Sequence, residues 1–598
     1  SLRACAGEYR DAVELAEYTI NNQKDYILEE LYKRKPDVLC FSCYIWNIDY
    51  VTDIAREYKK LCPSVPIWVG GPEVSYEVEA FLRENPYIDG VMIGEGEDTF
   101  RELCGYYAHK RKLSDIAGIA FRKNSTGNST SVNNIGGNKA GEIVFTSPRP
   151  IKNMSEIPFC YDTLDDFSNR IIYYESSRGC PFSCSYCLSS VDKTLRFRDT
   201  RIVKRELKFF IDQKVPQIKF VDRTFNCNHA HAMELWRFIK ANDNGVTNFH
   251  FEISADLLNQ EELELISDMR PGLIQLEIGV QSTNEVTIKE IHRTMKLERL
   301  KEVVRLIQSG NNIHEHLDLI AGLPYEDYDS FGRSFDEIYE LKPNQLQLGF
   351  LKVLKGSYMF EHAAEYGIVY HDKPPYEVMS TKWLSFDDVI KIKRVEDMLE
   401  VYYNSGQFEI TMKLMECIFD SAFEFFQELG DFYEANGYFG MSHSRIRRCE
   451  ILLEFLALYL HGCDSDDMAS VGLSGNAGDR DNTDFDENAI DRDNTDFDEN
   501  AQIYKMIQES LIFDLYYREN CKSRPVWATD IGSFKHMTHA YCKNGKLSHV
   551  EPFHYIFPDK HTRKLDELPK YHKEPVWALF HYDMRDPLDH QALVEYVE

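Results

Sequence analysis

The stretch YYESSRGCPFSCSYCLSS, residues 173–190, places three cysteines within eight positions: Cys180, Cys184 and Cys187. Three thiols this close could form a disulfide with one cysteine left over, a zinc site short of one ligand, or a [4Fe–4S] cluster with one open iron. The other cysteines, Cys40 and Cys43 among them, are interpreted as reduced thiols. The sequence around the three cysteines helps to choose between these three kinds of site.

The bulk composition limits the class of protein. A chain of 598 residues with 43% hydrophobic residues is expected to form several domains. Its apolar runs are shorter than the ~20 residues of a membrane helix, and no leader-like segment opens the sequence. The net charge of −30 argues against general nucleic-acid binding. We therefore expect a cytoplasmic protein that neither enters a membrane nor binds nucleic acid generally.

Residues 1–110 alternate strand and helix signals and predict a doubly wound, Rossmann-like α/β domain. The expected strands are 12–20, 37–46, 65–71 and 88–97, and the last two end in glycines. Residues 111–165 are expected to form a β connector, interrupted at 123–142 by a Ser-, Asn- and Gly-rich insert that we expect to be disordered.

Residues 166–369 continue the alternation and predict a (β/α)6 partial barrel. The expected strands are 171–177, 217–225, 248–254, 273–282, 313–324 and 345–353. Chemistry in such barrels lies at the carboxyl ends of the strands, and the three cysteines directly follow the first strand.

Residues 370–598 predict a mainly helical domain, with strand character returning near the end. Between 464 and 501 lies an acidic stretch in which DRDNTDFDENA occurs twice, at 479–489 and 491–501. Its aspartate spacing resembles a calcium loop, but the central glycine and the terminal glutamate are missing. We interpret the stretch as a disordered, solvated insert.

The C-x3-C-x2-C spacing, with an aromatic residue before the last cysteine and a barrel around it, resembles the radical S-adenosylmethionine (SAM) superfamily. The resemblance implies that Cys180, Cys184 and Cys187 hold a [4Fe–4S] cluster whose open iron binds SAM, which is cleaved to a 5′-deoxyadenosyl radical. It further implies that Glu277, in LEIGVQS, contacts the SAM ribose and that Arg293 meets the SAM carboxylate. The residues expected to bind SAM are Tyr186, Asp222, Ser254, Glu277 and Arg293.

This chain departs from the family pattern at one place. Many members carry Gly-Gly-Glu on the second barrel strand, where it holds the SAM amino group, but the sequence here is FVDRTF. The amino contact is therefore expected to fall to Asp222, at the end of that strand, or to backbone carbonyls.

The α/β domain before the barrel resembles the cobalamin-binding domain of cobalamin-dependent radical SAM enzymes. The similarity lies in SCYIWNI (42–48), GGPEVS (70–75) and GEGEDTF (94–100), each at the end of a strand, where glycines let a bulky ligand approach the backbone. The residues expected to bind cobalamin are Ser42, Tyr44, Gly70, Gly71, Pro72, Gly94, Glu95 and Gly96. The chain opens on what resembles the helix that follows the family's first strand, so that strand is expected to be missing. The C-terminal region resembles an uncharacterised domain that ends one subgroup of the family.

Three functions are compatible with these resemblances. The first is a cobalamin-dependent radical SAM enzyme that transfers a methyl group to an unactivated carbon, supplied with electrons by a flavodoxin- or ferredoxin-type donor. The second is a radical SAM cyclase or rearrangement enzyme whose first domain is structural. The third is a non-catalytic iron–sulfur protein that senses cobalamin or redox state. The sequence does not identify the substrate.

Overall fold

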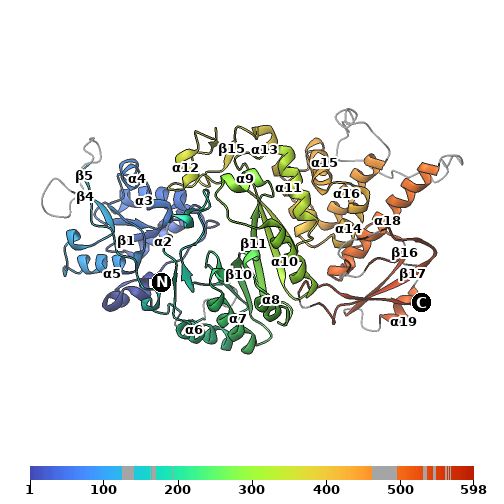
Figure 1. The fold of residues 1–598 in the computed structure, drawn as a ribbon, viewed down its shortest axis with the longest axis horizontal. Helices are drawn as coiled ribbons and strands as arrows, with labels where there is room; N and C mark the ends of the chain where they lie inside the picture. The colour runs from blue at the N-terminus through green and yellow to red at the C-terminus, as the bar shows by residue number, and fades with distance from the viewer. Residues whose placement is uncertain are drawn as a thin grey trace.

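The computed structural model shows three regions in a row (Figure 1). An α/β domain, coloured blue, leads into the green barrel, and the orange C-terminal region lies at the other end. The structure describes residues 1–123, 141–161, 163–164, 170–191, 193–460, 495–529, 532, 535–542, 547–558, 562, 565, 567–586 and 588–597. Within these residues no helix has the length and apolar character needed to cross a membrane.

The first domain is a five-stranded sheet with helices on both faces. The strands follow the order β1 (Leu39–Ser42), β2 (Ile67–Gly70), β3 (Gly90–Met92), β4 (Ile119–Lys123) and β5 (Glu142–Phe145). β1, β2 and β3 are parallel to one another, whereas β4 pairs antiparallel with both β3 and β5. The predicted connector strands therefore extend the sheet of the first domain. Lys123 and Glu142, which bound the predicted disordered insert, pair with each other; residues 124–140 lie outside the described residues.

Alternating side chains of the sheet pack against two sets of helices, because successive strand residues point to opposite faces. Val69 and Val91 face one core and Trp68 and Met92 face the other. The first core is completed by α2 (Lys24–Arg34), α3 (Ile48–Leu61) and α4 (Val78–Glu84). The second is completed by α1 (Leu2–Cys5), the short helix Gly7–Ala12 and α5 (Gly96–Tyr107).

The strand predicted over residues 12–20 is wrong. Its first residue ends the short helix Gly7–Ala12, and residues 13–19 pair with no described strand. Val13 and Tyr18 pack against the edges of the two cores, whereas the apolar side chain of Leu15 is exposed.

The barrel is a six-stranded sheet of parallel strands in the order β13-β12-β11-β10-β9-β6, and β6 and β13 are its two edges. The sheet is therefore open, as the partial-barrel prediction requires. Its strands are β6 (Ile172–Tyr174), β9 (Gln217–Phe220), β10 (Asn248–Ile253), β11 (Ile274–Gln281), β12 (His314–Ala321) and β13 (Gln345–Phe350). The intervening helices are α6 (Thr200–Asp212), α7 (His229–Ala241), α8 (Gln260–Ser267), α9 (Glu285–Glu290), α10 (Leu297–Ser309) and α11 (Tyr328–Tyr339).

The C-terminal region is mainly helical and shares one continuous core with the barrel. Its main helices are α13 (Phe386–Leu399), α14 (Glu409–Ile418), α15 (Ala422–Ala435), α16 (Arg445–Leu460) and α18 (Thr495–Arg518). An antiparallel sheet follows, formed by β16 (Ser548–Tyr555), β17 (Tyr571–His581) and β18 (Leu593–Val597). This sheet is the predicted return of strand character.

The acidic repeat is described only at its end, because residues 461–494 lie outside the described residues. The prediction of disorder over 464–501 is wrong for the last seven of these residues, since α18 begins at Thr495.

Candidate active site

The three cysteines lie on a closed loop at the carboxyl end of the first barrel strand. Two short strands, β7 (Ser177–Arg178) and β8 (Arg196–Phe197), pair antiparallel and bring residues 179 and 195 together. Cys180 and Cys184 are buried and Cys187 is half-buried. The Ser185 amide donates to the Ile291 carbonyl at 2.9 Å, and the Ser185 carbonyl accepts from the Met359 amide at 2.9 Å. The loop is thus held by late segments of the barrel.

Arg293 and Tyr186 lie beside the middle cysteine. Arg293 Nη1 lies 3.2 Å from the Tyr186 hydroxyl and 3.9 Å from Cys184 Sγ, and Nη2 donates to the Gly279 carbonyl. Burial raises the pKa of the Cys184 thiol, and the nearby Arg293 charge opposes that rise. A cation next to a buried thiol favours the thiolate, which is the form that binds iron. The structure therefore brings together three of the predicted residues.

A cavity of about 150 Å³ opens beside this group. Four predicted residues line it: Cys184, Ser254, Glu277 and Arg293. The other lining residues are Phe182, Arg223, Thr224, Glu252, Ile253, Gly279, Gln281, Thr294 and Asp318. They come from the cysteine loop, from the carboxyl halves of β10, β11 and β12, and from the segments after β9 and α9. The cavity therefore lies where barrel enzymes place their chemistry.

Two neighbouring side chains, Lys219 and His250, keep the Glu277 carboxyl group ionised. Its Oε2 lies 3.0 Å from His250 Nε2 and 2.9 Å from Lys219 Nζ. His250 and Lys219 outweigh the effect of burial and lower the pKa of Glu277 to about 2. At neutral pH this side chain can only accept hydrogen bonds, as it would from ligand hydroxyl groups.

Sequence reasoning missed two further acids in the cavity, Glu252 and Asp318. Burial and the nearby Glu277 raise the pKa of Glu252 to about 7, and the same two causes raise the pKa of Asp318 well above its ordinary range. Glu252 pairs in register with Glu277, and Asp318 pairs with Gly279 on the other side of β11. Both stand among apolar strand residues, where an acid is costly to bury without a partner, and this signal could have found them.

Asp222, predicted to contact the SAM amino group, does not line this cavity. It is fully buried, and its carboxylate accepts from the Ser176 amide at 2.9 Å, from the Ser176 hydroxyl at 2.7 Å and from the Ser177 hydroxyl. These bonds hold the segment just before the cysteine loop. Burial raises the pKa of Asp222 to about 6, although the three bonds oppose it.

Ser254 lines the cavity but its polar atoms are engaged locally. Its hydroxyl donates to Asp256 at 2.8 Å, and its amide and carbonyl bond the Asn226 side chain at 3.0 and 2.8 Å. The side chain that follows Asp222 in sequence, Arg223, reaches the cavity instead.

The residues predicted to bind cobalamin lie at the carboxyl ends of β1, β2 and β3. Ser42 ends β1, Gly70 ends β2, Pro72 begins the short helix Pro72–Val74, and Gly96 begins α5. Two of the glycines adopt backbone angles that favour glycine, with φ +115° at Gly71 and φ +74° at Gly94. A Cβ on Gly71 would lie 2.4 Å from the Cys43 carbonyl oxygen. The backbone therefore makes a close approach there that a side chain would prevent.

Two of these loops also meet the barrel side of the molecule. Tyr76 packs on the segment after β13, since a Cβ on Gly356 would lie 2.2 Å from its ring, and Glu73 accepts a hydrogen bond from Tyr376. Tyr44 stacks on the exposed ring of Trp46, with the ring centres 4.5 Å apart. Glu95 differs from the other predicted residues because its carboxylate is already bound by arginines of the cysteine loop.

The donor set fits the groups that the resemblance implies. No three His, Cys, Asp or Glu side chains in the described part of the chain are close enough to hold a single metal ion. A [4Fe–4S] cluster instead spreads its thiolates over separate irons. Three thiols on one loop, with Arg293 as a nearby cation, match that need.

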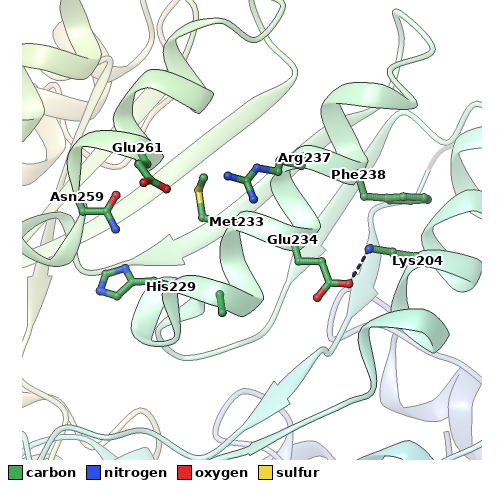
Figure 2. Close-up of a pocket in the computed structure, with 9 residues that line it drawn as sticks. Lys204, His229, Met233, Glu234, Arg237, Phe238, Asn259 and Glu261 are labelled. Carbon is green, nitrogen blue, oxygen red and sulfur yellow. Dashed lines mark hydrogen bonds and ion pairs between the residues drawn. The ribbon is translucent and has the colours of Figure 1, made fainter.

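A larger pocket of about 640 Å³ lies on the outside of the barrel, between α6, α7 and α8 (Figure 2). It is lined by Lys204, His229, Ala230, Met233, Glu234, Arg237, Phe238, Asn259 and Glu261. Lys204 and Glu234 form an ion pair at 2.6 Å across it. None of the predicted site residues lines this pocket.

Comparisons with known proteins agree with this organisation. Family models match in the order B12 binding domain (residues 1–104), radical SAM superfamily (174–338) and protein of unknown function DUF4080 (364–591). The chain thus combines a B12-binding domain, a radical SAM domain and a domain of unknown function. The radical SAM domain implies a [4Fe–4S] cluster and SAM, and the B12-binding domain implies cobalamin.

Individual relatives are distant. The cobalamin-dependent radical SAM methyltransferase TokK of Streptomyces tokunonensis is 28% identical over 51% of this chain and 45% of its own length. The anaerobic magnesium-protoporphyrin IX monomethyl ester cyclase of Rubrivivax gelatinosus is 22% identical over 57% of this chain and 60% of its own. The chain thus spans about half the length of these relatives. The solved structure of the cobalamin-dependent SAM radical enzyme OxsB has a TM-score of 0.54 at 16% identity, covering 86% of this chain and 78% of that one, and is similar in fold.

Proposed function

We propose that the chain is a cobalamin-dependent radical SAM enzyme that transfers a methyl group to an unactivated carbon. The observation that carries the proposal is the cysteine loop, which opens onto a cavity lined by Cys184, Glu277 and Arg293. The B12-binding and radical SAM domains in one chain, and the methyltransferase TokK among its relatives, support it.

The residues of the chain take distinct roles in this proposal. Cys180, Cys184 and Cys187 hold the cluster, and Arg293 offsets negative charge beside Cys184. Glu277, kept ionised by Lys219 and His250, accepts hydrogen bonds from the SAM ribose. When bound, the cluster would supply the electron that cleaves SAM, and cobalamin would supply a carrier for the methyl group.

The remaining polar groups of the cavity suit a polar part of SAM or of the acceptor. Glu252 and Asp318 face it with carboxyl groups whose pKa values burial raises, and Arg223 adds a cation. In the first domain, Gly94 has open space where a side chain would stand, Gly71 lets the loop after β2 pack against the Cys43 backbone, and Tyr44 and Trp46 offer exposed ring surface to cobalamin. We further propose a flavodoxin- or ferredoxin-type electron donor and a cytoplasmic, oxygen-poor setting, because an open cluster iron is easily oxidised.

Product analysis tests this function directly. The full chain, loaded with cluster and hydroxocobalamin under strictly anaerobic conditions, is given a reductant and SAM. Formation of both S-adenosylhomocysteine and 5′-deoxyadenosine, with the former requiring cobalamin, supports methyl transfer. Failure to consume SAM would exclude the proposal and leave the non-catalytic sensor.

The cyclase among the relatives favours one alternative, a radical SAM cyclisation or rearrangement. That reaction predicts 5′-deoxyadenosine without cobalamin-dependent S-adenosylhomocysteine. The same assay therefore separates the two enzymes.

A further inference from the structure

The ends of the cysteine loop meet at a pair of arginines. Arg178 and Arg196 stand directly opposite each other where β7 pairs with β8. Next to Arg178, Gly179 has φ +88°, and a Cβ there would lie 2.6 Å from the Thr194 carbonyl oxygen. Only glycine fits so close a contact, so the neck of the loop is closed tightly.

Both arginines bind the same carboxylate, which belongs to the first domain. Glu95 Oε1 lies 2.6 Å from Arg196 Nη2 and 3.4 Å from Arg178 Nη1. Its other oxygen accepts from the Lys152 amide at 3.2 Å. Burial acts to raise the pKa of Glu95, but its hydrogen bonds and the two arginine charges outweigh it and lower the pKa. Glu95 is thus an ionised link between the two ends of the loop.

Arg178 adds two more acids to the link. Its Nη2 lies 2.6 Å from Glu97 and its Nε lies 2.9 Å from Glu175. The side chains of Arg178, Arg196 and Glu95 are only 18%, 13% and 24% exposed. Partly buried charges lose more than exposed ones when a partner is removed, because the remaining charge is left without compensation.

A second carboxylate holds the same neck from the barrel side. Asp222, at the end of the second barrel strand, binds Ser176 and Ser177, the two residues before Arg178. Two acids from two domains therefore fix the base of the loop that carries Cys180, Cys184 and Cys187.

We propose that Glu95 is a positioning residue for the iron–sulfur cluster, which clamps both ends of the cysteine loop and ties them to the first domain. This replaces the direct contact with cobalamin that the sequence predicted for Glu95. It rests on the proposed function in one respect, that the three cysteines hold the cluster. Because Glu95 lies in the loop 94–96 at the end of β3, the placement of the first domain determines the placement of the cysteines.

The test compares Glu95→Gln, which keeps the size and removes the charge, with the wild-type full chain loaded with cluster. The matched control is Glu79→Gln, in the same domain, which breaks the exposed Glu79–Arg83 pair of 2.5 Å. The measurements are the rate of iron release to a chelator without oxygen and the electron paramagnetic resonance spectrum of the reduced cluster. We expect Glu95→Gln to release iron about tenfold faster and to shift the spectrum, as loss of a partly buried charge partner predicts. The control should match the wild type in both.

A second variant keeps the inference testable if Glu95→Gln perturbs folding, which far-ultraviolet circular dichroism would reveal. Arg196→Gln removes the partner that lies 2.6 Å from Glu95. The double variant, Glu95→Gln with Arg196→Gln, should release iron no faster than the more affected single variant, because the effects of substitutions at two residues in contact are not additive. Additive rates, or a wild-type rate and spectrum in Glu95→Gln, would overturn the clamp and leave the proposed function standing. A wild-type chain that takes up no iron would overturn both.

Discussion

The guanidinium of Arg293 lies 3.2 Å from the hydroxyl of Tyr186, and the same Nη1 atom lies 3.9 Å from Cys184 Sγ. One cation thus contacts the aromatic residue and the middle cysteine of the motif, although more than a hundred residues separate them in sequence. The second terminal nitrogen donates to the Gly279 carbonyl, which fixes the guanidinium plane beside the cavity.

Arg293→Lys should weaken SAM binding while iron content stays unchanged. A lysine has no planar fork and cannot reach Tyr186 and Gly279 together. Loss of a charged hydrogen bond predicts an affinity about tenfold lower, measured by equilibrium dialysis on the cluster-loaded chain. Arg299→Lys, on the surface helix α10, is the control and should bind as the wild type does. Equal SAM affinities in the wild type, Arg293→Lys and Arg299→Lys would contradict a role for Arg293 in SAM binding.

Each of Cys180, Cys184 and Cys187, changed singly to serine, should lose most of the bound iron after anaerobic reconstitution, because a cluster with two protein thiolates is poorly held. Cys227→Ser is the matched control. Cys227 is half-buried near Cys180 but stands outside the motif, so its variant should retain about four irons per chain. Iron loss in Cys227→Ser with retention in Cys187→Ser would show that the ligands have been assigned wrongly.

Gly279→Ala should impair SAM binding with little loss of stability. An added Cβ would lie 2.3 Å from the Gln281 side-chain nitrogen and 3.4 Å from Arg293 Nη2, so Gln281 must move within the cavity that both residues line. Gly349→Ala on β13 is the control, since its Cβ would meet only ordinary contacts of 3.5 Å or more. SAM affinity and thermal midpoint are measured on both. An unaltered affinity in Gly279→Ala would argue against SAM in this cavity.

Glu252→Gln should gain stability relative to the wild type as pH rises from 6 to 8. The folded chain, with a pKa of about 7 at Glu252, still holds a proton that the unfolded chain released near its ordinary pKa of about 4.3. The wild type therefore loses free energy of unfolding across this window, and the variant avoids about 1 kcal/mol of that loss. The range stays above the sequence pI of about 5.1, where solubility is lowest.

Urea unfolding of the apo chain at both pH values measures this difference. Glu264→Gln, on the exposed side of α8, is the control and should show the same difference from the wild type at pH 6 and pH 8. A Glu252→Gln difference that does not change with pH would mean that Glu252 is ionised in the folded chain throughout.

The barrel was well predicted because its signals are local. The first five strands are each followed by a helix of the barrel, and the three cysteines carry their spacing in one loop. The segment 12–20 failed because an alternating pattern also occurs where no neighbouring strand accepts it.

The site was predicted only in part, because some of its contacts depend on long-range packing. Glu277 and Arg293 reach the cavity, but Asp222 turns to Ser176 and Ser177, which no spacing rule reveals. Glu95 stands between two glycines, as a ligand-binding loop residue would. The arginines that bind it lie more than eighty residues away in sequence. The pairing of residues across domains requires the three-dimensional structure.

Metal content tests the central claim most directly. The full chain is produced with cobalamin, purified without oxygen, and analysed for iron and cobalt by mass spectrometry. The account predicts about four irons and about one cobalt per chain, with the iron absent in Cys184→Ser and the cobalt retained. A chain that binds neither metal above background, although it is folded and was supplied with both, would contradict the account.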